Sequence, residues 1–294
     1  MKYASGAAFR AALEERLRQE ADSRGVTVGR LRKVVVFDRL LVRLAVAASG
    51  RWVLKGGYAL ELRLRDRART TMDVDLDRAD DEEAATRDLI AAAQLDVGDF
   101  FEFEVERAGE AGDVGAGGGI RYRVRARLGG REFDTVVVDV GLLDPLPEHA
   151  EMLVGPALLS FAGIAPATVP AVPLEQHLAE KLHAYTRSYG AYAAVSSRPK
   201  DLVDIVLMAE LQAYDAVALR DAVEQTFAVR ATHALPDFLA PPPPAWGASY
   251  GALAGEVGVS PKLEDGYGVA ARLFEPVFSN ASGRWSAAAK AWQP

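Results

Sequence analysis

The chain has 294 residues, a formal net charge of −7 and no cysteine. Half of its residues are hydrophobic and 26% are charged, as in ordinary globular proteins, and the length suffices for a sizeable core. Without cysteine, the chain has no disulfide, thiolate nucleophile or Cys-ligated zinc. No apolar run approaches a membrane span and the N-terminus lacks an apolar signal region, so we expect a cytoplasmic protein with no membrane partner.

Basic residues are concentrated near the N-terminus, where the first 70 positions hold 16 Lys and Arg against 7 Asp and Glu. Two amphipathic helices are predicted there, over residues 7–24 and 28–48. We expect them to pack on a sheet and to leave Arg32, Arg39 and Arg43 at a basic rim. Such a rim either contacts phosphates or is only solvated, and the sequence leaves both alternatives open.

A short apolar run ending at Lys55 is followed by Gly56 and Gly57, and a helix is predicted from Tyr58. Two adjacent glycines let the backbone turn sharply and approach a ligand, so that successive N–H groups can point at an anion. The positive end of the following helix would strengthen such a site. A phosphate cradle at Gly56 and Gly57 is therefore one interpretation; a simple turn is the other.

Two carboxylates follow on a predicted strand, at Asp73 and Asp75. Alternate residues of a strand share a face, so both would lie on one side, where they repel each other unless a cation neutralises them. Oxygen ligands of this kind suit Mg²⁺ or Mn²⁺. A calcium-binding EF-hand that includes Asp77 is excluded, because Arg78 and Ala84 occupy its glycine and glutamate positions. Together with the glycine pair, the two carboxylates predict a nucleoside triphosphate site.

This stretch resembles the first motif of the AbiEii/AbiGii-type toxin nucleotidyltransferases, a DUF1814-like branch of the DNA-polymerase-β-like superfamily that includes mycobacterial MenT-type toxins. The resemblance implies that a set of residues contacts the nucleotide and that Asp73 and Asp75 are catalytic and bind metal. The nucleotide contacts in this stretch would be Lys55, Gly56, Gly57, Arg69 and Thr71.

A helix is predicted over residues 80–93, followed by strands over residues 100–107, 120–128 and 132–140, the last two joined by a Gly-Gly hairpin. The middle strand alternates apolar residues with arginines, which would share one face. That face is either solvated or guides a nucleic-acid strand. The four arginines are Arg121, Arg123, Arg125 and Arg127.

The third of these strands ends in a run of valines closed by Asp139. A carboxylate in such a place is costly unless it is paired or bound to a ligand, so Asp139 is a candidate third metal ligand on the strand beside Asp73 and Asp75. It could instead cap the following loop. The resemblance favours the first alternative, because the superfamily has a metal triad. Asp134, on the same strand, is excluded from this set.

Residues 142–172 are apolar and rich in proline, and we interpret them as the crossing into a helical domain. A helix is predicted from Pro173 and a second one from Pro199. On residue types alone, Lys181 would be a surface lysine and Asp201 an N-terminal helix charge. The stretches LEQHLAEKLHAY and SSRPKDLVDIVLM, however, resemble the later motifs of the same family.

That second resemblance implies that Lys181 contacts the triphosphate and that Asp201 acts in catalysis, with Asp204 in support. Which aspartate faces the nucleotide is left open. Further helices are predicted over residues 219–228, 249–257 and 266–278, and the polyproline run 241–244 is interpreted as a surface spacer. The histidines near prolines, His149 and His233, are interpreted as structural.

The predicted fold is α/β (α+β), with a nucleotidyltransferase-type mixed sheet flanked by helices in residues 1–172 and a helical bundle in residues 173–294 that completes the site. The resemblance implies a toxin with a cognate antitoxin, and we expect a monomer. It would transfer a nucleoside monophosphate from a triphosphate to the 3′ acceptor end of tRNA, with Mg²⁺ or Mn²⁺, releasing pyrophosphate and blocking translation.

Other functions use the same residues. A transferase acting on a small molecule or protein, as antibiotic adenylyltransferases do, would need the same site. A kinase-like toxin would release diphosphate, and a non-catalytic nucleotide-binding module would tolerate loss of the carboxylates. A separate hypothesis concerns Thr71: phosphate there, added by an antitoxin acting as a kinase, would repel both metal ligands and triphosphate.

Overall fold

The computed structural model describes residues 2–111, 118–142, 146–147, 149–189, 194–195 and 198–294. Ser196 and Ser197, the first two residues of the stretch SSRPKDLVDIVLM, lie outside the described residues. The chain divides into two compact units. The first comprises Met1–Arg63 and Thr70–Val172, and the second comprises Leu64–Arg69 and Pro173–Pro294.

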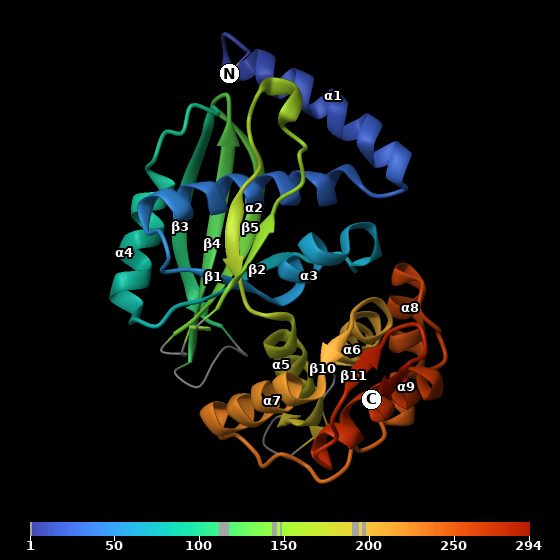
Figure 1. Ribbon diagram of the computed structural model, residues 1–294. Coiled ribbons are helices and arrows are strands. Elements are labelled where there is room, and N and C mark those ends of the chain that lie inside the picture. The colour runs from blue at the N-terminus through green and yellow to red at the C-terminus, as the bar shows by residue number, and fades with distance from the viewer. Residues whose placement is uncertain (1, 112–117, 143–145, 148, 190–193, 196–197) are drawn as a thin grey trace. The chain divides into compact units, whose positions relative to one another are not determined.

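The first unit is built on a seven-stranded mixed sheet with the order β3-β4-β5-β2-β1-β7-β6 (Figure 1). Strand β2 lies at its centre, antiparallel to β1 and parallel to β5, so it is hydrogen-bonded on both edges. The predicted mixed sheet is thereby confirmed. The strands are β1 (Val53–Lys55), β2 (Asp73–Asp77), β3 (Phe101–Glu110), β4 (Gly119–Leu128), β5 (Arg131–Gly141), β6 (Glu151–Val154) and β7 (Thr168–Ala171).

Helices flank this sheet, and α2 lies across one of its faces (Figure 1). The predicted boundaries of the N-terminal helices hold because the caps are local: Ser5 and Thr27 accept backbone N–H groups at the helix starts, and Gly25 adopts the left-handed conformation that ends α1. The helices are α1 (Gly6–Arg24), α2 (Val28–Ala47), α3 (Gly56–Leu64) and α4 (Glu82–Ala93), with a 3₁₀ turn at Ser160–Ala162.

The core of the first unit lies between α2 and the central strands. On β2 and β5 the residues that face α2 are aliphatic and almost fully buried, as in Val74 and Val138. Because strand side chains alternate, the residues between them project from the opposite face of the sheet. The sequence pattern therefore gives the central strands one apolar face, which forms the core, and one polar face, which carries the candidate site residues.

The expected basic rim on α2 is wrong for two of its three arginines. Arg39 and Arg43 are buried, and Arg43 donates from Nη1 and Nη2 to the two carboxylate oxygens of Asp99, at 2.9 and 2.7 Å. Arg39 pairs with the neighbouring Asp38. A guanidinium can be buried when its charge and its N–H groups are all matched in this way. Only Arg32 is partly exposed, where it pairs with Glu14.

The interpretation of residues 142–172 as a crossing segment is also wrong, because this stretch adds β6 and β7 to the sheet. Strand β7 pairs with β1 in parallel, and β6 pairs with β7 as the edge strand. The prolines conceal these strands in the sequence: Pro170 lies within β7, where a residue without an N–H group is tolerated but weakens the strand pattern.

The second unit is mainly helical, which confirms the predicted C-terminal helices. Its described residues also form short strands that were not predicted, because two or three residues are too few to show alternation. Trp285 on β11 is fully buried and donates its indole N–H to the carbonyl of Ala209 at 2.7 Å. This contact fixes the C-terminal strands on the end of α6.

The elements of the second unit begin with a 3₁₀ turn, Arg65–Arg67, contributed from the middle of the first unit's sequence. Its helices are α5 (Leu174–Thr186), α6 (Pro199–Leu211), α7 (Ala216–Arg230), α8 (Gly247–Val257) and α9 (Leu263–Phe278), and a further 3₁₀ turn spans Pro244–Trp246. Strands β10 (Tyr214–Asp215), β11 (Arg284–Ser286) and β12 (Ala291–Gln293) form one small sheet, and β8 (Ser188–Tyr189) pairs with β9 (Ala194–Val195).

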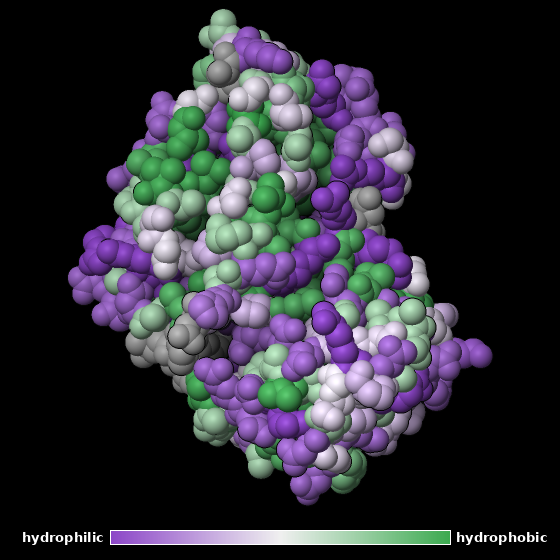
Figure 2. Space-filling view, viewed as in Figure 1, coloured by the Kyte–Doolittle hydropathy of each residue, from purple (hydrophilic) through white to green (hydrophobic). Residues whose placement is uncertain are grey.

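The face drawn in Figure 2 mixes hydrophilic side chains with patches of hydrophobic ones. Among the large hydrophobic side chains that are more than half exposed, Val46, Met72 and Phe238 come from separate parts of the chain, whereas Met152 and Val154 share strand β6. Within the residues that the structure describes, no helix combines the length and the apolar character needed to span a bilayer.

Candidate active site

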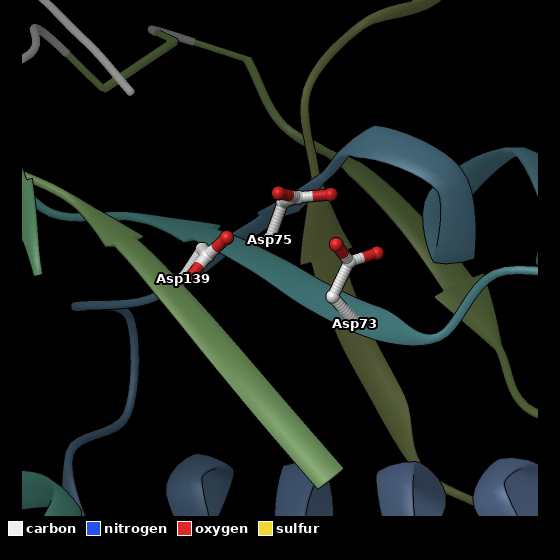
Figure 3. Close-up of side chains that lie close together, drawn as sticks. All are labelled: Asp73, Asp75 and Asp139. Carbon is white, nitrogen blue, oxygen red and sulfur yellow. The ribbon is translucent and has the colours of Figure 1, made fainter. Parts of the chain in front are cut away.

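Three carboxylates converge on the central strands of the first unit. Strands β2 and β5 run parallel with Asp75 directly beside Asp139, and Asp73 lies two residues before Asp75 on the same face. One oxygen from each of Asp73, Asp75 and Asp139 lies within 4.8 Å of the other two. Figure 3 shows the three side chains close together, two on β2 and one on β5. The expected neighbourhood of the three carboxylates is thus present.

The donor set fits a hard divalent cation. Carboxylate oxygens are the preferred ligands of Mg²⁺ and Mn²⁺, and three of them at this spacing can share an ion. Asp139 is only 6% exposed and the other two are partly buried, so like charges gather where water screens them incompletely. A bound cation would balance part of this negative charge.

Arg121 on β4 faces the third carboxylate. It lies directly opposite Asp139, and its Nε and Nη2 donate to Oδ1 and Oδ2 of that residue at 2.8 and 2.6 Å. This hydrogen bonding with Asp139 raises the pKa of Arg121, although partial burial opposes the rise. The sequence pattern predicts Arg121 only as part of the arginine column; its pairing with Asp139 follows from the register of the β4–β5 hairpin.

The whole arginine column lies on the carboxylate face of the sheet. Three of the four arginines are exposed and Arg125 is partly buried, and those beyond Arg121 face glutamates of the neighbouring strand β3. Arg123 lies 3.5 Å from Glu106, and Arg125 lies 2.8 Å from Glu104. The column is therefore a solvated ladder of opposite charges, which agrees with the first of the two alternatives for this face.

The glycine turn packs against the second carboxylate. Gly56 has a φ of 64°, in the left-handed region, and a Cβ atom placed on it would overlap the carboxylate of Asp75. Both the conformation and the space therefore require glycine at this position. Helix α3 begins at Gly56, so its first N–H groups lie at this turn. The two ends of the sequence stretch from Val53 to Asp77 meet in space.

Lys55 and Thr71 have protein partners in this unit. The ammonium of Lys55 is buried and pairs with the carboxylate of Asp77, a residue that sequence analysis considered only as part of an EF-hand. The hydroxyl of Thr71 donates to Oδ1 of Asp73 at 2.9 Å, and the residue is only 4% exposed. Thr71 therefore orients Asp73, and its hydroxyl oxygen is covered in this conformation.

The remaining residues of the predicted site form a separate cluster in the second unit. Nζ of Lys181 on α5 lies 3.3 Å from Asp201 and 2.7 Å from Asp204, both on α6. Arg69 donates from Nε and Nη2 to Asp204 at 2.9 and 3.0 Å, and Arg198 lies 2.9 Å from Asp201. The surface-lysine alternative for Lys181 is wrong, because this side chain is buried.

Charge coupling keeps this cluster ionised. Burial disfavours the charged form of Lys181, but Asp204 and Asp201 outweigh it and raise the pKa of Lys181 to about 12. Burial likewise opposes ionisation of Asp204, but Lys181 and Arg69 hold the pKa of that carboxyl well below its usual range. Both aspartates are fully buried. Lys181 and Asp204 are thus a charged pair at neutral pH.

A protein family and several solved structures are similar to this chain. The family profile described as "Nucleotidyl transferase AbiEii toxin, Type IV TA system" matches residues 39–266. Among solved structures, the nucleotidyltransferase toxin MenT4 from Mycobacterium tuberculosis H37Rv has a similar fold, with 20% identity, a TM-score of 0.58, and coverage of 92% of this chain and 98% of that chain. JHP933 from Helicobacter pylori matches at 15% identity and a TM-score of 0.45, covering 84% of this chain and 91% of its own.

No curated protein sequence matches the chain. The family profile nevertheless covers well over half of it and includes the triad, the glycine turn and the buried lysine cluster. On this evidence the chain is a nucleotidyltransferase and belongs to the AbiEii family of toxins from type IV toxin–antitoxin systems.

Proposed function

We propose that this enzyme transfers a nucleoside monophosphate from a nucleoside triphosphate to the 3′ acceptor end of tRNA and so blocks translation. The observation that carries the transfer chemistry is the convergence of Asp73, Asp75 and Asp139 beside the Gly56 turn. Family membership implies a nucleotide substrate and an antitoxin. The tRNA acceptor is supported by the motif resemblance alone.

In this reaction the acceptor hydroxyl oxygen attacks the α-phosphorus of the triphosphate. The bond between that phosphorus and the oxygen bridging to the β-phosphate breaks, and pyrophosphate leaves. The hydroxyl proton passes to a carboxylate oxygen of the triad. Bound Mg²⁺ or Mn²⁺ would activate the hydroxyl and balance the charge on the phosphates.

The chain's own residues supply position and charge. Asp73, Asp75 and Asp139 would hold the cation, and Thr71 keeps Asp73 oriented through its hydrogen bond. The N–H groups at Gly56 and Gly57 would bind phosphate oxygens at the start of α3. Catalysis then depends mainly on positioning and electrostatic stabilisation, as in phosphoryl transfer generally.

The second-unit cluster enters this proposal through the family's later motifs. We assign Lys181 a contact with the triphosphate and assign Asp201 and Asp204 to holding the lysine ammonium and tuning its charge. The supporting contacts are the ion pairs of Lys181 with both aspartates and of Arg69 with Asp204. In this role the aspartates act through Lys181, and they are positioning residues.

The test is to incubate the enzyme with each labelled triphosphate, Mg²⁺ and total tRNA, and to sequence the RNA 3′ ends. The variants Asp73→Asn and Asp75→Asn should lower transfer at least about a hundredfold, because each removes a metal ligand. Asp134→Asn is the matched control, since that β5 carboxylate pairs with Lys33 at 3.0 Å instead. Full transfer by both triad variants would overturn the proposed role of the carboxylates.

The products also separate the other functions. Labelled small molecules in place of RNA would identify a small-molecule transferase, and release of diphosphate instead of pyrophosphate would identify a kinase. If no triphosphate gives any product with RNA, protein or small molecule, the proposed acceptor and reaction are both wrong.

A further inference from the structure

Arg121 holds the carboxylate that the proposed metal site needs as its third ligand. Its fork-shaped guanidinium takes both oxygens of Asp139, at 2.8 and 2.6 Å. The side chain of Asp139 is 8% exposed, whereas that of Arg121 is 44% exposed. The carboxylate is therefore fixed in the sheet, and the arginine is the partner that has room to move.

A divalent cation and Arg121 compete for the two carboxylate oxygens of Asp139. A divalent metal ion bound to an oxygen of Asp139 would place two positive charges close to the guanidinium of Arg121, and the two cations would repel each other. Occupation of the triad thus favours departure of Arg121 from at least one oxygen. On β3, Gly109 lies across from Arg121, whereas the other column arginines lie across from glutamates of that strand.

We propose that Arg121 is an internal counter-ion that yields Asp139 to a divalent cation and then pairs with the phosphates of the incoming nucleotide. This inference rests on the proposed function, because it assumes that the triad binds metal. A guanidinium matches phosphate oxygens as well as it matches a carboxylate, so the exchange replaces one forked pair by another. It makes the binding of cation and of triphosphate mutually dependent.

The chain offers a matched control. Arg123 lies two residues further on the same strand and on the same face, with 52% of its side chain exposed, but its partner is Glu106 on β3. Replacing either arginine by glutamine removes one positive charge from the same surface. Only Arg121→Gln removes the partner of Asp139.

The experiment measures Mn²⁺ binding to the full-length protein by electron paramagnetic resonance, with and without inorganic tripolyphosphate. Arg121→Gln should bind Mn²⁺ alone about tenfold more tightly than the wild type, because the competitor is gone. At equal free Mn²⁺, tripolyphosphate should tighten Mn²⁺ binding in the wild type and much less in Arg121→Gln. Arg123→Gln should behave as the wild type, and Arg121→Lys should fall between them.

The outcomes distinguish this inference from the proposed function. Equal or weaker Mn²⁺ binding by Arg121→Gln, with folding shown by an unchanged thermal transition, would overturn the role of Arg121 alone. If the wild type binds no Mn²⁺ under either condition, or binds it as well after Asp73→Asn, the proposed metal site fails and this inference with it. Should Arg121→Gln fail to fold, the intermediate affinity expected for Arg121→Lys decides the question.

Discussion

The two charged regions of the molecule are built on opposite plans. On the sheet of the first unit, three acidic side chains share an open face, and Arg121 pairs with the most buried of them. In the second unit the two aspartates of α6 are fully buried, and Lys181, Arg69 and Arg198 surround them. The first cluster is only partly buried, whereas each aspartate of the second is fully buried and pairs with two basic side chains.

This difference predicts different costs of mutation. Removing a like charge from an open acidic face relieves repulsion, so loss of function there need not lower stability. Removing one member of a buried network leaves its partners desolvated and unmatched, so stability falls whatever the effect on chemistry. Substitutions in each of the two regions test this difference.

The largest effect on stability is expected for Lys181→Met. It leaves Asp201 and Asp204 buried with fewer counter-charges, and should lower the free energy of unfolding by about 3–5 kcal/mol. Urea denaturation measures this quantity. The exposed Arg123→Gln should change it by less than about 1 kcal/mol, as surface pairs do. Equal stability of the two variants would show that the buried cluster is not the stabilising network described above.

Gly56→Ala should affect activity more than stability. The added methyl group would displace the carboxylate of Asp75, and we expect transfer to fall about a hundredfold, with a loss of about 1–2 kcal/mol from the left-handed backbone. Gly25→Ala is the control, because that position is also left-handed but has nothing within 4 Å of the added atom. Similar activities in these two variants would argue against close packing of the turn on Asp75.

A pH effect of intermediate size is expected from His183 in the second unit. Burial, aided by Arg230 and His233, lowers the pKa of His183 to about 3. In the unfolded chain this histidine is protonated below about pH 6.5, whereas in the folded chain it stays neutral. The free energy of unfolding therefore decreases as the pH falls from about 6.5 toward 3, by up to about 1.4 kcal/mol per pH unit. Denaturation at pH 7, 6 and 5 should show a shallower decline in His183→Gln; parallel declines would contradict this account.

The smallest effect is expected for Thr71→Val, which removes the hydroxyl that orients Asp73 while keeping the shape of the side chain. Loss of one hydrogen bond to a carboxylate corresponds to about 1 kcal/mol, or roughly fivefold in transfer rate. Thr71→Ser retains the hydroxyl and should recover most of the activity. If serine performs no better than valine, the hydrogen bond has no part in positioning Asp73.

Much of the first unit could be predicted because its signals are local. Alternation along β4 and the run of valines in β5 each depend on neighbouring residues only. The strands β6 and β7 were missed because their prolines suppress the strand pattern and their partners are distant in sequence. The pairing of Arg121 with Asp139 depends on strand register, which no local sequence pattern predicts.

The arginines of α2 illustrate a second limit. Arg39 and Arg43 are buried only because acidic partners, Asp38 and Asp99, are present to match them, and Asp99 lies more than 50 residues away in the chain. A burial forecast from residue type assumes that charges stay in water. Charged side chains do not have to stay in water when residues from different elements form an ion pair, as Lys181 and Asp204 also do.

The assignment of Leu64–Arg69 to the second unit has a practical meaning for anyone dividing this protein. A chain cut after Val172 would retain Arg69 but lose Asp204, so the ion pair between these two residues would be broken. The complementary fragment would lack the same interaction from the other side. Neither fragment contains the complete ion pair. Chimaeras between relatives should therefore keep Leu64–Arg69 together with the C-terminal helices.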